Sequence, residues 1–189
     1  AKVVSTVVDR LGSESHAAAA PAVYKWRLAI CRQAAPGIDV DSHAKAAIVY
    51  ALNSPTMFAF EPLADVVSAA SFKATKPETK LLIDFLVTVM LSGGGAAAFA
   101  AFEKKAGKAF LPENGVADGL RKARLASLCS ALQGKKVVSF AEVNKTLELA
   151  AEADVESYVI DAALAGIIDV KVNRNDHTVD VNSVTPLKF

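Results

Sequence analysis

Two patterns of hydrophobic and polar positions divide the chain. In the middle, Leu82, Leu86 and Met90 recur at intervals of four, which is the spacing of one face of a buried α-helix. Near the end, residues 168–173 and 178–182 alternate strictly between apolar and polar, and the polar residues 174–177 separate them. This alternation predicts two strands joined by a hairpin loop, each strand with one buried and one solvated face. The pattern therefore predicts a mainly α-helical protein with a small antiparallel sheet.

Start and stop residues set the expected helix bounds. Asp41 or Ser42 is expected to cap the second helix, Pro77 lies in the first turn of the fourth, and Asp154 is expected to cap the last. Ser139 to Glu142 forms a capping box in front of another helix. We expect helices over residues 15–34, 41–52, 62–70, 77–92, 96–105, 117–132, 140–147 and 154–166.

The order of these elements predicts two segments. Residues 1–116 repeat a unit of helix, break and helix without a clean sequence period, which favours an irregular helical solenoid. The last unit of such a stack exposes an apolar face, so it needs a cap. Residues 117–189 supply a helix, a short strand at Val137-Val138, two helices and a hairpin, which is the element order of a winged helix.

One uncharged stretch, residues 85–102, is about long enough to cross a bilayer. Ser92-Gly93-Gly94-Gly95 interrupts it, and the residues that follow are weakly apolar alanines. We expect two buried helices with a glycine break between them rather than a membrane helix. The first residues show no signal-peptide pattern, and we expect a cytoplasmic protein.

The distribution of charge argues against DNA reading. The chain carries 21 basic and 20 acidic residues, a net charge of +1, which gives no general attraction to nucleic acid. A DNA-reading helix needs lysine or arginine near the phosphates, whereas residues 154–166 hold three acids and no base. Basic residues cluster elsewhere, where a solvated face is favoured and a weak RNA or ribosome contact is the alternative: Lys104, Lys105, Lys108, Arg121, Lys122, Lys135 and Lys136.

The sequence offers no motif for catalysis. The glycines 93–95 lack the lysine and the serine or threonine of a phosphate-binding loop. His16, His43 and His177 are scattered and are expected at the surface. Cys31 and Cys129 are far apart and predict two buried, reduced thiols. We predict a protein that is not an enzyme and has no cofactor, metal or small-molecule substrate.

Several segments carry a resemblance to a known family. They are Arg124-Leu125, Val138-Ser139-Phe140, residues 155–162, and the two strand segments 169–173 and 179–181, while residues 60–63 and 81–89 look like the helices upstream. These residues resemble the PCI family, helical stacks that end in a winged helix. Its members are scaffold subunits of the proteasome lid, the signalosome and translation initiation factor 3. Many PCI domains place an acid where Asn173 stands.

The resemblance implies a non-catalytic subunit whose winged helix pairs side by side with that of a neighbouring PCI subunit. An exposed edge strand offers unpaired backbone groups for such pairing. The residues expected at an edge are Val137, Val138, Val179, Asp180, Val181 and Asn182. Residues 155–162 favour the initiation factor over the signalosome or lid. The implied partners are then the other subunits of that factor and, through the complex, the small ribosomal subunit.

Overall fold

Helices form most of the structure, a computed structural model that describes residues 6, 8, 20–33, 36–70 and 72–185. Its first elements are α2 (Ala20–Gln33), α3 (Val40–Asn53), α4 (Glu61–Ser68), α5 (Pro77–Phe85), the π-helix η2 (Leu86–Leu91), α6 (Gly95–Ala106), α7 (Phe110–Glu113) and α8 (Gly119–Leu132). Then follow β1 (Val137–Ser139), α9 (Phe140–Leu147), the 3-10 helix η3 (Glu152–Asp154), α10 (Val155–Leu164), β2 (Ile168–Asn173) and β3 (Thr178–Val184). The predicted fold class, mainly α with a small antiparallel sheet, is confirmed.

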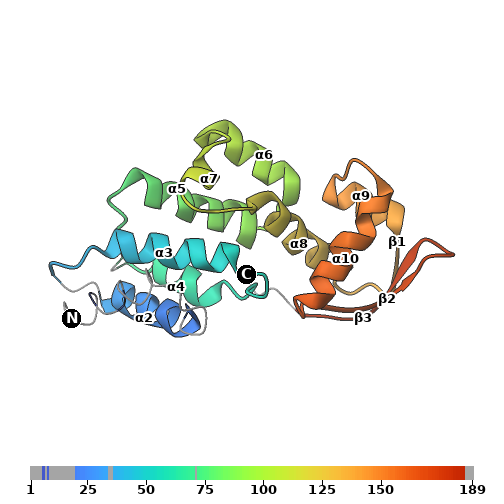
Figure 1. Ribbon diagram of the computed structural model, residues 1–189, viewed down its shortest axis with the longest axis horizontal. Coiled ribbons are helices and arrows are strands. Elements are labelled where there is room, and N and C mark those ends of the chain that lie inside the picture. The colour runs from blue at the N-terminus through green and yellow to red at the C-terminus, as the bar shows by residue number, and fades with distance from the viewer. Residues whose placement is uncertain (1–5, 7, 9–19, 34–35, 71, 186–189) are drawn as a thin grey trace.

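The three strands form one antiparallel sheet in the order β1-β3-β2. Val179 in the central strand lies opposite Val138 on one side and Val172 on the other. Val170, Val172 and Val181 pack against the core of the winged helix, whereas Asp169 and Lys171 are exposed. The predicted alternation of buried and solvated positions is therefore confirmed. Together with α8, α9 and α10, the sheet forms a winged helix (Figure 1).

Two hydrophobic cores meet at α8. Ala123 and Ala126 face the larger core, which is built from α2 to α7, while Leu125 and Leu128 face the core of the winged helix. In Figure 1, α2 to α7 fill one half of the molecule, the winged helix fills the other, and α8 runs between them. Phe58, from the loop between α3 and α4, also lies in the winged-helix core. The two halves thus share a helix and an aromatic side chain.

The glycine run breaks the helical path as predicted. Helix α5 continues into η2, and Gly93 and Gly95 then adopt positive φ angles of 64° and 56°, a region that side chains rarely tolerate. Gly95 also packs directly against Ser127, whose hydroxyl donates to the carbonyl of Gly93 at 3.1 Å. The close approach of α6 to α8 depends on this contact. Within the described ranges, we find no helix with the length and apolar character that crossing a membrane requires.

The start of α3 differs from the prediction. Asp39 caps the helix, and its carboxylate accepts from the backbone N–H of Ser42 at 3.1 Å, so neither Asp41 nor Ser42 is the cap. Asp41 lies in the first turn of α3, is only 5% exposed, and accepts from the backbone N–H of Thr75 at 3.0 Å. Burial raises the pKa of Asp41, but the hydrogen bonds from Thr75 and Lys76 outweigh it and lower the pKa overall. Asp41 therefore ties α3 to the approach of α5.

Helix starts elsewhere show one confirmation and two corrections. Ser139 caps α9 as predicted, because its hydroxyl accepts from the N–H of Glu142 at 3.2 Å. Asp154 occupies the predicted N-cap position of α10, but its side chain makes no capping hydrogen bond, and its backbone already has helical geometry at the end of η3. Helix α7 was not predicted, since four residues are too few to show a helical period. Residues 15–19 and 34 of the first predicted helix lie outside the described residues.

We expect Gly95→Ala to destabilise the protein more than Gly134→Ala. Both positions have positive φ, which costs about 1–2 kcal/mol for alanine. A Cβ at Gly95 would also collide with Oγ of Ser127, whereas the space around Gly134 is open. The excess cost for Gly95→Ala should be about 1–3 kcal/mol in urea unfolding. Equal losses for the two variants would show that the contact between α6 and α8 adapts freely.

Candidate partner-binding surfaces

Among the described residues, the sheet has two free edges, formed by β1 and β2, and β3 is not one of them. Val138 pairs with Val179, and the backbone N–H of Val181 donates to the carbonyl of Lys136 at 2.8 Å. The expectation that Val179 to Asn182 forms an edge is therefore wrong in its geometry, because β3 returns between the other two strands. Val137 and Val138 do lie in an edge strand. That either strand binds a partner stays a prediction.

Backbone groups point outward from both edge strands. In an antiparallel ladder, alternate residues direct their N–H and C=O groups toward the neighbouring strand. Because Lys136 and Val138 lie opposite Val181 and Val179 in bonded pairs, the groups of Val137 point away from β3. The same alternation leaves Val172 of β2 pointing outward. Sequence reasoning missed the β2 edge, because strand order within a sheet leaves no mark on periodicity.

The basic residues do not form one free surface. Lys104, Lys108 and Lys136 are exposed. Other members are engaged: Lys105 pairs with Asp84 at 2.9 Å, Lys135 with Glu142, and Arg121 with Asp161. Lys122 is buried, so its place in the expected RNA or ribosome contact is corrected. A cluster of basic residues in the sequence does not reveal which lysine is buried, because the aliphatic stem of a lysine can lie along an apolar face.

Helix α10 occupies the position of the recognition helix in a DNA-binding winged helix. Its side chains include the acids Glu156 and Asp161, and no lysine or arginine. Glu156 accepts from Nε of Arg174 in the hairpin at 2.7 Å, and Asp161 pairs with Arg121 of α8. Both acids therefore bind neighbouring parts of the winged helix itself, and α10 offers no positive charge to a polyanion.

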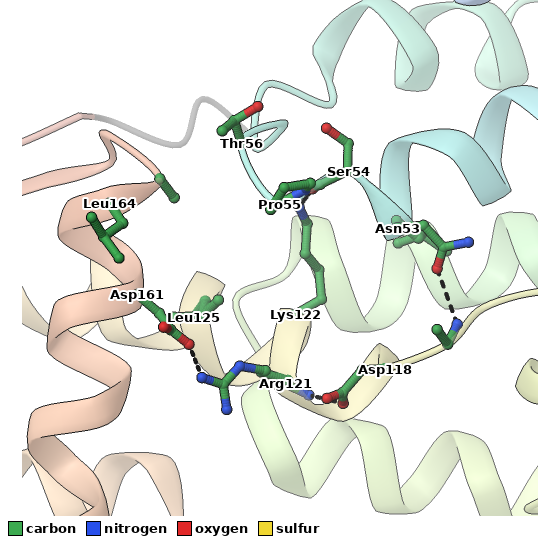
Figure 2. Close-up of a pocket in the computed structure, with 13 residues that line it drawn as sticks. Asn53, Ser54, Pro55, Thr56, Asp118, Arg121, Lys122, Leu125, Asp161 and Leu164 are labelled. Atoms are coloured by element: carbon green, nitrogen blue, oxygen red, sulfur yellow. Dashed lines mark hydrogen bonds and ion pairs between the residues drawn. The ribbon is translucent and has the colours of Figure 1, made fainter. Parts of the chain in front are cut away.

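A cavity of about 470 Å³ lies at the junction of the two halves. Three elements that are distant in sequence line it, namely the loop after α3, the first turns of α8 and the end of α10. Figure 2 shows Leu164 at the left, Pro55 and Thr56 at the top, Lys122 directly below Pro55, and Arg121 at the bottom. The apolar part of the lining includes Leu52, Pro55, Leu125 and Leu164. Sequence reasoning missed this cavity, because only the tertiary fold brings its three elements together.

Lys122 is the unusual group in this cavity. The side chain is 5% exposed, and its Nζ donates to the carbonyl oxygen of Ser54 and lies 3.8 Å from the centre of the Phe58 ring. Burial lowers its pKa from the ordinary 10.5 to about 8, because desolvation disfavours the charged form. Lys122 thus ties α8 to the loop that carries Phe58 into the winged-helix core.

No described histidine or cysteine lines this cavity. His43 is 2% exposed and its Nδ1 lies 3.0 Å from Nη1 of Arg27, so the expected surface position is wrong: the guanidinium of α2 provides a buried polar partner. His177 is exposed in the hairpin as predicted, and His16 lies outside the described residues. Cys31 and Cys129 are buried and unpaired, as predicted, and burial raises the pKa of each thiol to about 12. No set of three or more metal-ligating side chains gathers within the described ranges.

We expect Lys122→Met to remove a pH dependence of stability. The unfolded chain releases the Lys122 proton near pH 10.5 and the folded chain near pH 8, so the wild type gains stability as pH rises between these values. The gain should approach about 3 kcal/mol relative to Lys122→Met. Urea unfolding at intervals from pH 7 to 10 measures it, with the exposed Lys136→Met as control. A wild-type-to-variant difference that stays constant over this range would contradict the prediction.

Comparison with known proteins gives one match to a protein family. No curated protein matches the chain. Residues 100–183 match the model of the PCI domain. This segment runs from the middle of α6 to near the end of β3. The matched segment contains both free edges, the α8 residues of the junction cavity and the whole of α10. On this evidence, the winged-helix half of the protein is identified as similar to a PCI domain.

Proposed function

We propose that this protein is a non-catalytic scaffold subunit of a multi-subunit complex assembled through PCI domains. The observation that carries the proposal is the PCI match over a winged helix with two free sheet edges and no basic side chain on α10. In such a scaffold the helical segment, residues 1–116, extends the surface for partners, and the winged-helix segment, residues 117–189, joins a neighbouring subunit.

Addition of a strand from a neighbour is the physical basis of the proposed assembly. Outward-pointing backbone groups at Val137 and Val172 present hydrogen-bond donors and acceptors that pair with no other strand among the described residues. A strand from a neighbouring winged helix would pair with one of these edges and so continue the sheet. Val137 is 57% exposed, so pairing there would also cover an apolar side chain. β1 has three residues and β2 has six, which makes β2 the longer template.

Within this class we propose the translation initiation factor 3 complex of eukaryotes, in a position like that of its M subunit. The support is the likeness of residues 155–162, now seen as the body of α10, to that subunit. The partners would be a neighbouring PCI subunit, the other subunits of the factor and, through them, the small ribosomal subunit in the cytoplasm. The signalosome and the proteasome lid are the alternatives. A weak RNA-binding module has less support, because Lys122 is buried and Arg121, Lys105 and Lys135 are ion-paired.

Gentle purification of the tagged protein from cell extract tests this assignment. We expect mass spectrometry to identify subunits of initiation factor 3 together with proteins of the small ribosomal subunit. A tagged, unrelated helical-repeat protein purified in parallel is the control. Recovery of signalosome or lid subunits instead would leave the scaffold role intact and refute the initiation factor.

Proline substitutions at the two edges test the proposed mode of assembly. Val137→Pro and Val172→Pro each remove an outward N–H and leave the bonds to β3 in place, so the domain should fold. We expect the variant at the edge that binds the neighbour to lose most co-purifying subunits. Circular dichroism and urea unfolding check the fold of each variant.

The matched controls are Val137→Thr and Val172→Thr, which keep both the N–H group and a β-branched side chain. Val181→Pro is unsuitable, because it deletes the bond to Lys136 inside the sheet. Full assembly of folded Val137→Pro and Val172→Pro proteins would refute strand addition as the mode of contact.

A further inference from the structure

The junction cavity contains a buried positive charge that lacks a counter-charge. Among the ion pairs of the described residues, none involves Lys122. The two acids of the cavity lining are already engaged. Asp118 accepts from the backbone N–H of Arg121 at the start of α8, and Asp161 pairs with the Arg121 guanidinium. Lys122 therefore relies on neutral groups alone.

Those neutral groups satisfy the ammonium only in part. An ammonium has three N–H donors, and the Ser54 carbonyl takes one of them. The Phe58 ring stabilises the charge through its negative face, a smaller effect than pairing with a carboxylate. Removing a charge from water without a partner costs several kcal/mol, and the lowered pKa of Lys122 expresses that cost. A carboxylate that entered the cavity would restore the missing partner.

The apolar walls of the cavity indicate what a bound ligand would carry besides a carboxylate. Leu52, Pro55 and Leu125 contribute apolar surface beside Lys122. At the rim, Leu164 is 78% exposed, which is the largest exposure of a large hydrophobic side chain among the described residues. Ile160, one turn before it on α10, is also exposed. A matching ligand therefore combines a carboxylate with an adjacent apolar side chain that covers the rim.

The chain's own residues 186–189 supply no acidic side chain for Lys122. They follow Thr185, whose N–H donates to the carbonyl of Ile167 at 2.9 Å, and Ile167 comes two residues after the cavity-lining Ala165. In the sequence Pro-Leu-Lys-Phe, two residues are large and apolar. Their charged side chain is Lys188, however, which would add a second positive charge beside Lys122.

We propose that the junction cavity is a docking groove for an acidic and apolar segment of another protein subunit, with a Glu or Asp carboxylate against Lys122 and an apolar side chain over Leu164. The choice of a protein occupant rests on the proposed scaffold function, while the carboxylate specificity rests on the cavity itself. Docking there would brace the loop after α3 against the end of α10, and so hold the winged helix at one angle to the helical segment.

Two capped peptides test the groove on the whole chain. The first is acetyl-Ala-Leu-Glu-Leu-Ala-amide, and the second has Gln in place of Glu. We expect the Glu peptide to bind about tenfold more tightly than the Gln peptide, because only its carboxylate neutralises Lys122. NMR titration should report binding by shifts at residues 53–56 and 161–165. The lysine side-chain signal of Lys122 should show a raised pKa when the Glu peptide is bound.

Matched variants locate the contact. Lys122→Met keeps the length of the side chain and should abolish the preference for Glu, while Lys136→Met should leave it unchanged. Leu164→Ser, at an exposed position that cannot unfold the core, should weaken both peptides alike. Equal binding of the two peptides, no binding of either, or a Glu preference that survives Lys122→Met would overturn the proposal.

Removal of residues 186–189 tests whether the chain's own tail, rather than another subunit, occupies the groove. We expect the affinity of the Glu peptide to stay within about twofold of that of the full chain, since a factor of two is below 0.5 kcal/mol. A gain of tenfold or more would show that the chain's own tail fills the groove, and would overturn the proposal. These binding results do not depend on which complex is recovered from cells, so failure of the groove and failure of the scaffold assignment remain distinct.

Discussion

The sharing of α8 between two hydrophobic cores is the constraint on which the rest of the structure depends. A helix whose successive faces are buried on both sides cannot rotate or slide without opening a cavity in one core or the other. Ala123 and Ala126 face the helical segment, and Leu125 and Leu128 face the winged helix. Phe58 adds a second tie, because it leaves the helical segment and fills a place in the winged-helix core. Lys122 lies over Phe58 and holds the loop on which it is carried.

This shared helix has consequences for a scaffold. If the two halves were joined by a flexible linker, a partner bound to the sheet edge would have no defined direction relative to partners on the helical stack. Continuous packing through α8 transmits the orientation of one half to the other. Gly95 allows this packing, since its contact with Ser127 lets α6 and α8 approach closely. The junction cavity is a part of this interface that the described side chains leave unfilled.

The sequence predicted a secondary-structure element correctly where a single residue type or a single hydrophobic period determines that element. The glycine break and the alternation in the two long strands each predicted the element that the structure shows. The spacing of Leu82, Leu86 and Met90 predicted a buried helix, although Leu86 and Met90 lie in the π-helix η2 and not in an α-helix. Pairwise tertiary contacts decide the remaining features. The cap of α3 is Asp39 and not the predicted Asp41 or Ser42, and it is the approach of Thr75 that buries Asp41. β1 and β2 pair with opposite sides of β3, which makes β3 the central strand. The residues of β3 alone do not predict this position.

The candidate surfaces illustrate the same limit. A run of basic residues predicts a solvated face on average, yet Lys122 lies buried because its position on α8 points toward the loop after α3. The groups that chemistry would recruit first are engaged in structure: His43 contacts Arg27, and burial raises the pKa of both thiols to about 12. What the described surface presents to other molecules is of a different kind, namely outward backbone groups along two short strands and a groove whose buried ammonium lacks a counter-charge. Both features gain free energy only when another chain supplies the missing partner, which is why recognition is the activity that the structure supports best.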